Sequence, residues 1–134
     1  MEDASLSRRE ILRVLAGLGV AAGAADVLAQ DAAKVDPRGY RVLVENDQVR
    51  VLEYIGRPRL GVCGTGMHSH PDHVTVVMND ARVKVTLPDG KSFLADNKAG
   101  DVFFEAAGTH SVENIGGRDV RSLLIELKPA PKKA

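Results

Sequence analysis

Short apolar runs rich in β-branched residues, separated by turn residues, make up most of the chain beyond Gly39. No stretch there has the roughly 3.6-residue periodicity of an amphipathic helix. The sequence Leu87-Pro-Asp-Gly-Lys91 is typical of a tight hairpin turn. Several short strands at this spacing predict an all-β sandwich or barrel. The expected strands span residues 40–44, 48–55, 74–78, 82–87, 91–94, 101–105, 110–112 and 121–127.

The first 30 residues differ in composition from the rest. A polar start leads into a run rich in Ala, Gly, Leu and Val, which is the order of segments in a secretory signal peptide. Arg8 and Arg9 lie within Ser7-Arg-Arg-Glu-Ile-Leu-Arg13, which resembles the twin-arginine export motif. Residues 1–29 are therefore expected to be a cleaved signal peptide of the twin-arginine type, and the protein is expected in the periplasm or otherwise exported.

Two alternatives to a cleaved signal peptide are an amphipathic first helix and a membrane anchor. The helix has some support, because Asp26 lies close to the apolar stretch. The uncharged run over residues 14–25 has 12 residues, fewer than the ~20 needed to span a bilayer. We therefore expect no stable membrane anchor after cleavage, with a mature chain that begins near Gln30.

Composition excludes several classes of partner. The chain of 134 residues is long enough for one domain, and its 18 basic and 18 acidic residues balance. Without a basic excess, nucleic-acid binding is not expected. Aromatic residues make up only 4% of the chain, which disfavours recognition by ring stacking. Cys63 is the single cysteine, so an intramolecular disulfide is impossible, and it is interpreted as a small buried residue.

All four histidines fall in two short segments. His68 and His70 are two residues apart, so on a strand they point to one face and can chelate one ion. His73 would face outward on a regular strand, but a one-residue bulge at Pro71 would turn it inward. His110 has to be placed opposite by another strand. The pattern predicts a metal site.

These segments resemble the paired motifs of the cupin family, namely a His-x-His pair and a later Gly-to-His segment that ends in Asn. Here they are His68-Ser-His70 and the run from Gly100 through Gly108-Thr-His110 to Asn114. The resemblance covers roughly residues 40–127. It implies a double-stranded β-helix, a jelly-roll-like barrel, over residues 40–128. Residues 30–39 are expected to form an extended arm and residues 129–134 a tail.

The chain departs from the family at the third ligand. Val74 and Thr75 stand where the family has a glutamate, and Ala106 replaces a proline of the second motif. His73 is the natural substitute, which gives a site of His68, His70, His73 and His110. The rival is Asp72, which with His70 and His110 would form a two-histidine, one-carboxylate triad.

Other polar residues are candidates for roles around the metal. Asn114 shares a face with His110 and is expected to point inward behind it. Glu53, Glu105 and Glu126 lie in expected strands and would serve as a general base if they face inward, while exposure is the default for such residues. The arginines at positions 41, 50 and 82 could bind an acidic substrate, but solvated faces or dimer contacts are the favoured interpretation.

Two classes of function follow from the resemblance. The first is a metal-dependent oxygenase or isomerase that acts on a small organic molecule, with one divalent ion (Fe, Mn, Zn, Cu or Ni) held by the histidines. The second is a non-catalytic module that binds a metal or a ligand. A homodimer is expected in either case. An open coordination position beside an inward acid or base would favour the enzyme, because function depends on the site rather than on the fold.

Overall fold

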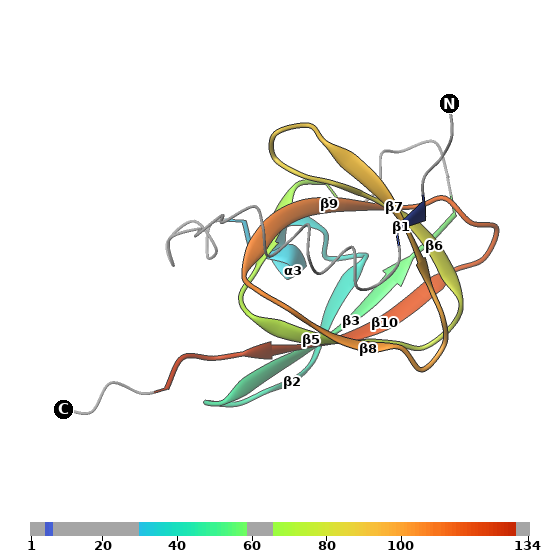
Figure 1. Cartoon of the computed structure of the whole chain (residues 1–134). Coiled ribbons are helices and arrows are strands. Elements are labelled where there is room, and N and C mark those ends of the chain that lie inside the picture. Colours follow the sequence, from blue (N-terminus) through green and yellow to red (C-terminus); the bar gives the residue numbers. More distant parts are fainter. Residues whose placement is uncertain (1–4, 7–29, 59–65, 131–134) are drawn as a thin grey trace.

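Two five-stranded sheets face each other and form a barrel in the computed structural model, which describes residues 5–6, 30–58 and 66–130 (Figure 1). One sheet has the strand order β1-β7-β6-β9-β4 and the other β2-β3-β10-β5-β8. The elements are β1 (Ser5–Leu6), α3 (Ala32–Val35), β2 (Tyr40–Glu45), β3 (Val49–Gly56), β4 (His68–His70), β5 (His73–Val77), β6 (Ala81–Thr86), β7 (Ser92–Asn97), β8 (Val102–Glu105), β9 (Gly108–Asn114) and β10 (Val120–Leu127).

The predicted hairpin joins β6 to β7. Gly90 has a φ of 86°, a left-handed conformation that glycine adopts without a steric penalty. The backbone N–H of Leu87 donates to the carbonyl of Lys91 (2.8 Å), and Asp89 accepts from the N–H of Lys91 (2.9 Å). This turn sets the register in which Val83 faces Ala95 and Val85 faces Phe93. The all-β prediction is therefore confirmed.

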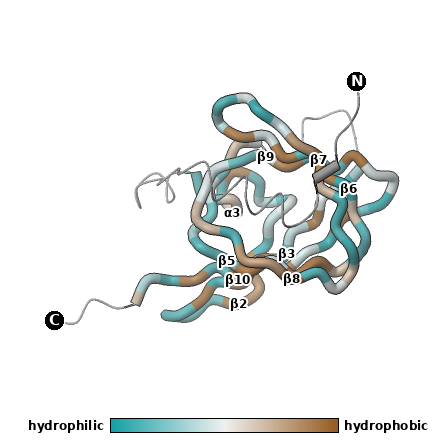
Figure 2. Tube along the Cα trace, in the orientation of Figure 1, coloured by the Kyte–Doolittle hydropathy of each residue, from teal (hydrophilic) through white to brown (hydrophobic). Residues whose placement is uncertain are grey.

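Side chains alternate between the inside and the outside of the barrel, as strand geometry requires. Val83, Val85, Ala95 and Leu124 point into one buried cluster with Leu52. Figure 2 shows hydrophobic and hydrophilic residues interleaved along the strands, so each sheet gives one apolar face to the interior. The interior of the barrel is its hydrophobic core.

The sequence analysis expected an extended arm over residues 30–39, but this segment is not extended throughout. Residues 32–35 form the single helical turn α3, closed by hydrogen bonds from Val35 N–H to the carbonyl of Asp31 (2.9 Å) and from Asp36 N–H to that of Ala32 (2.9 Å). Ala32 is completely buried in the core cluster. A helical turn brings this small side chain onto the barrel while its own backbone bonds are satisfied. Among the described residues, no helix is long and apolar enough to cross a membrane.

The chain changes sheets between His70 and His73, where the sequence analysis expected a one-residue bulge in a single strand. β4 ends at His70 and pairs with β9, whereas β5 begins at His73 and pairs with β8 and β10. Pro71 has no N–H to donate, so a ladder ends there readily. The three-residue β4 was also absent from the expected strands. The change of sheet turns His73 into the barrel without a bulge.

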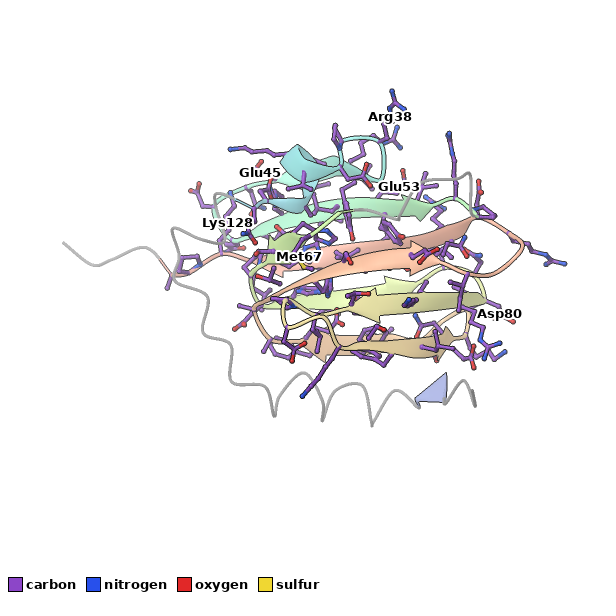
Figure 3. All side chains as sticks on the ribbon, turned by 90° about the horizontal axis from the view of Figure 1, so that it is seen from above. Arg38, Glu45, Glu53, Met67, Asp80 and Lys128 are labelled. Carbon is purple, nitrogen blue, oxygen red and sulfur yellow. The ribbon has the colours of Figure 1, made fainter. Side chains whose placement is uncertain are left out.

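Charged side chains lie at both ends of the barrel. Glu45 and Lys128 lie together at one end and Asp80 at the other, and Met67, directly before His68, lies on the Lys128 side (Figure 3). The Lys128 ammonium donates to Glu45 at 2.8 Å. The histidine segment is therefore near one end of the barrel rather than at its middle.

Two exposed glycines provide a test of this backbone. Gly100 has a φ of 85°, and an added Cβ would meet nothing within 4 Å, so the backbone conformation alone opposes a side chain. Gly100→Ala is expected to lower the free energy of unfolding by about 1–2 kcal/mol. Gly117 has equally open surroundings without a positive φ, so Gly117→Ala is expected to be neutral or slightly stabilising. Urea unfolding of both variants measures the difference, and equal effects would contradict the assigned turn.

Candidate metal centre

Three histidines converge at one end of the barrel interior. His68 on β4 lies directly opposite His110 on β9, and His70 follows two residues later on the same face of β4. One ring nitrogen from each of the three lies within 4.8 Å of the other two. The cross-strand pair and the His-x-His spacing together make the triangle that the sequence analysis predicted for these three residues.

His70 is the most constrained of the three. Its Nδ1–H donates to Oε1 of Glu126 (3.1 Å), which fixes the tautomer and leaves the lone pair on Nε2. Nε2 is buried and has no hydrogen-bond partner among the described residues. Burial lowers the pKa of His70 well below its usual value, so the ring is neutral at neutral pH. A buried, unpartnered imidazole nitrogen is costly unless something binds it.

Glu126 connects His70 to a buried ion-pair network. Its Oε2 accepts from Nε of Arg50 (2.8 Å), and Arg50 also pairs with Asp31. The side chain of Glu126 is 3% exposed and that of Arg50 18%. Burial raises the pKa of Glu126, and Arg50 opposes that rise. Carboxylates in this position behind a histidine orient the ring and raise its basicity toward a metal.

His68 is held on both ring nitrogens. Nδ1–H donates to the carbonyl of Gly66 (2.9 Å), and the hydroxyl of Tyr40 donates to Nε2 (3.0 Å). Burial lowers the pKa of His68 and raises that of Tyr40, so both groups are neutral. An ion that takes the Nε2 lone pair has to displace the phenol hydrogen bond, which places Tyr40 beside the site. The sequence analysis gave Tyr40 no role, because the sequence showed only that Tyr40 begins an expected strand.

His110 completes the triangle from β9. Its ring lies 4.9 Å from that of His68 and 5.3 Å from that of His70, centroid to centroid. Burial lowers the pKa of His110 to about 3. All three imidazoles are therefore neutral, and metal ligation by histidine requires the neutral form.

His73 lies beside the triangle but makes other bonds. Its ring is 4.9 Å from that of His70, yet the cluster of mutually close ligand atoms in the described residues contains only His68, His70 and His110. Nδ1 of His73 donates to the carbonyl of Pro71 (2.8 Å), and Nε2 contacts Oε2 of Glu105 (2.6 Å).

Glu105 and His73 form a cross-strand pair. Burial disfavours charge on both groups, but their mutual hydrogen bond outweighs it, raising the pKa of His73 and lowering that of Glu105. Thr75 donates a second hydrogen bond to Glu105 (3.1 Å). That His73 is a fourth ligand stays a prediction. Glu105 is the inward carboxylate that lies opposite His73 on the neighbouring strand.

The remaining candidates take other positions. Asp72, the rival third ligand, is exposed and accepts from the N–H of Ala107 (2.7 Å). Asn114 is buried, but its amide donates to the carbonyls of Gly56 (2.8 Å) and Arg118 (2.6 Å) rather than to a histidine. It therefore supports a turn.

The other charged candidates lie apart from the histidines or outside the described residues. Glu53 is held by Arg41 (2.8 Å) and Arg121 (2.7 Å). The hydrogen bond from Arg121 lowers the pKa of Glu53. Arg82 pairs with Asp96. Cys63 lies outside the described residues.

The start of the described segment adjoins the ligand strand. The N–H of Ser69, between His68 and His70, donates to the carbonyl of Gln30 (2.7 Å), and its hydroxyl contacts the Gln30 side chain (3.2 Å). Asp31 pairs with Ser69 as an isolated bridge. β4 is therefore held on one side by β9 and on the other by residues 30–31.

A cavity of about 80 Å³ opens from the histidine end into the core. His110, Glu105 and Tyr40 line the end next to the triangle, and Val112 and Phe103 lie farther along. A molecule in this space would contact His110 and the Glu105 carboxylate together.

The donor set fits a transition metal ion. Three neutral imidazoles suit Zn, Cu, Fe or Ni, and Nε2 of His70 supplies a lone pair that no group in the described part of the chain uses. Three protein ligands leave a further coordination position for water or a substrate.

Arg50 provides a test of the network behind His70. Arg50→Met leaves the Glu126 and Asp31 carboxylates unpaired, so the free energy of unfolding is expected to fall by about 3–5 kcal/mol. Lys128→Met removes one partner of the half-exposed Glu45 pair and is expected to cost no more than about 1 kcal/mol. Chemical denaturation of both variants makes the comparison. Equal losses would show that Arg50 does not stabilise the buried carboxylates.

Comparison with known proteins found no matching family model and no matching curated protein. Among solved structures, the chain is similar to a cupin domain from Bordetella pertussis, with 28% identity and a TM-score of 0.59 over 67% of this chain and 92% of that one. It is also similar in fold to the protein BH2720 from Bacillus halodurans, with 23% identity and a TM-score of 0.52 over 78% of this chain and 80% of that one. The chain therefore has the double-stranded β-helix fold of cupin domains.

Proposed function

We propose that this protein is a metal-dependent enzyme that holds one divalent transition metal ion through His68, His70 and His110 and acts on a small organic molecule inside the barrel. The buried Nε2 of His70, unpartnered within the described residues and close to the other two imidazoles, is the observation that carries the proposal. When bound, the ion polarises an oxygen of the substrate or activates dioxygen.

The surroundings of the triangle favour an enzyme over a non-catalytic binding module. A storage or transport site needs only closed coordination, whereas this triangle adjoins a cavity. Glu105 faces that cavity and is buried against His73 and Thr75, so its carboxylate is ionised and held in one place. A fixed, ionised carboxylate beside the triangle can accept a hydrogen bond from a bound molecule and hold it in one orientation. Glu126 and Arg50 orient His70 and do not line the cavity.

Metal content of the purified protein tests the site. The wild type is expected to hold about one metal ion per chain, and His70→Ala and His110→Ala are each expected to lose it because each removes one of three ligands. Asp72→Ala serves as the control and is expected to retain the metal. His73→Ala is expected to weaken binding if this residue is the fourth ligand, and unchanged affinity would contradict that prediction.

The measurement is elemental analysis after dialysis, with circular dichroism to show that each variant remains folded. Absence of stoichiometric metal from the wild type, or retention in folded His70→Ala, would contradict the proposed centre.

We also propose that the protein is exported through the twin-arginine route. Residues 1–4 and 7–29 lie outside the described part of the chain, so the proposal rests on the sequence around Arg8 and Arg9. Gln30 contacts Ser69, so cleavage after residue 30 would remove a contact of β4, whereas cleavage before it would remove the pairing of β1 with β7. The expected homodimer stays a prediction.

Fractionation of cells tests export directly. Replacing Arg8 and Arg9 together by Lys keeps the charge but changes the paired guanidinium groups of the motif. The variant is expected to accumulate in the cytoplasm at its full length, while the wild type appears shortened in the exported fraction. Lys34→Arg, an equally conservative change beyond the signal, is the control. Normal export of the double Lys variant would contradict the twin-arginine assignment.

A further inference from the structure

The described residues give the cavity beside the histidines walls without a cationic side chain. Among them the lining contains no Lys or Arg, and it is mostly aliphatic and aromatic. The arginines considered for an acidic substrate are placed elsewhere. Arg41 pairs with Glu53, Arg50 with Glu126 and Arg82 with Asp96. The carboxylate in the lining, Glu105, is paired with His73. A cationic molecule would therefore lose its hydration here without gaining a partner, and an anionic group would find one only in the metal ion.

One polar group in this lining has no partner. Oδ1 of Asn97 is buried and accepts no hydrogen bond from the described residues. The strand register places Asn97 at the far end of the cavity from the histidines. On the inner face of β9, Val112 follows His110 and pairs with Val85 of β6. Val83 and then Ala81 follow Val85 along β6, and Ala81 pairs with Asn97 of β7. The cavity thus has a metal-facing end and an apolar wall, and the buried acceptor Oδ1 of Asn97 lies at its other end.

The volume limits the occupant further. At about 80 Å³ the space is small, roughly half of the ~150 Å³ cavity that accepts a benzene ring. A slender aliphatic chain fits such a space better than a ring.

We propose, on the basis of the metal centre proposed above, that this cavity selects a slender molecule that is uncharged and largely apolar beyond any atom bound to the metal and that carries a hydrogen-bond donor for Asn97. The molecule lies along the apolar wall and exposes atoms toward His110 and Glu105. A small aliphatic alcohol is the simplest member of this class. Amines are excluded by the cost of burying their charge, and a carboxylate is accepted only against the metal ion.

A matched set of four-carbon probes tests the selectivity. We would titrate zinc-loaded protein with 1-butanol, with its isomer methyl propyl ether, which lacks a donor, and with butyrate and butylammonium. The shifts of the methyl resonances of Val83, Val85 and Val112 report binding inside the cavity. The alcohol is expected to bind roughly three- to tenfold more tightly than the ether, because one hydrogen bond is gained. Butylammonium is expected to bind at least about thirtyfold more weakly, and so is butyrate in metal-free protein, where no cation compensates its charge.

Two variants assign the effect to Asn97. Asn97→Leu is expected to remove the preference for the alcohol over the ether while leaving the binding of the ether similar. Gln48→Leu removes an exposed amide outside the cavity and is expected to change neither value. If Asn97→Leu does not fold, the four affinities of the wild type still decide the proposal. Comparable binding of butylammonium, comparable binding of butyrate to the metal-free protein, no binding of 1-butanol, or an unchanged preference in folded Asn97→Leu would each overturn it.

Replacing zinc by paramagnetic Mn²⁺ locates the probe relative to the metal. Protons of bound 1-butanol are expected to relax faster in the manganese protein than in the zinc protein, and equal relaxation in a metal-loaded sample would overturn the placement next to the centre. If the protein takes up no metal, the proposed function fails. The same four titrations on metal-free protein then still measure the selectivity of the cavity. Failure of the proposed metal centre and failure of the proposed selectivity are therefore distinguishable.

Discussion

The buried carboxylate of Glu126 joins the parts of the molecule on which the metal centre depends. It lies on β10 of one sheet, bonds to His70 on β4 of the other sheet, and pairs with Arg50, which also holds Asp31 ahead of the barrel. A buried carboxylate is tolerated only with such partners. Each bond therefore has two effects: it compensates the buried charge, and it fixes the position of a residue near the ligands. The orientation of the His70 ring follows from this network.

The interior of the barrel is divided into an end with ionisable side chains and an apolar middle. Ionisable side chains gather at the end formed by β4, the start of β5 and the end of β10, whereas Val83, Val85 and Leu124 fill the middle. Burial keeps the three imidazoles neutral, while the contact between His73 and Glu105 keeps a pair of charges beside them. The three ligands and the balanced His73–Glu105 pair carry no net charge of their own, so a bound divalent ion would bring two positive charges to this end of the core.

Much of the fold and half of the site could be predicted from the sequence. Alternating β-branched runs and turn residues predicted the β architecture, and the spacing of His68 and His70 predicted their shared face, because both depend on local geometry. The direction of the three strand glutamates could not be predicted. Alternation shows which residues share a face, but not which face is inside until the pairing partners are known. Glu105 and Glu126 proved to face the histidine end, whereas Glu53 pairs with Arg41 and Arg121. The change of sheet after Pro71 was missed for the same reason.

The contacts of β4 also determine when the centre can form during synthesis. His70 is oriented by a residue 56 positions later in the chain, and Arg50 binds a carboxylate 76 positions later. Residues 30–31 flank β4 on the side opposite β9. A nascent chain that has passed His110 but has not reached residue 126 thus contains all three histidines, yet His70 has no carboxylate to hold its ring. The ribosome must complete almost the whole barrel before a properly oriented ligand set exists, so the histidine triangle is a property of the finished polypeptide.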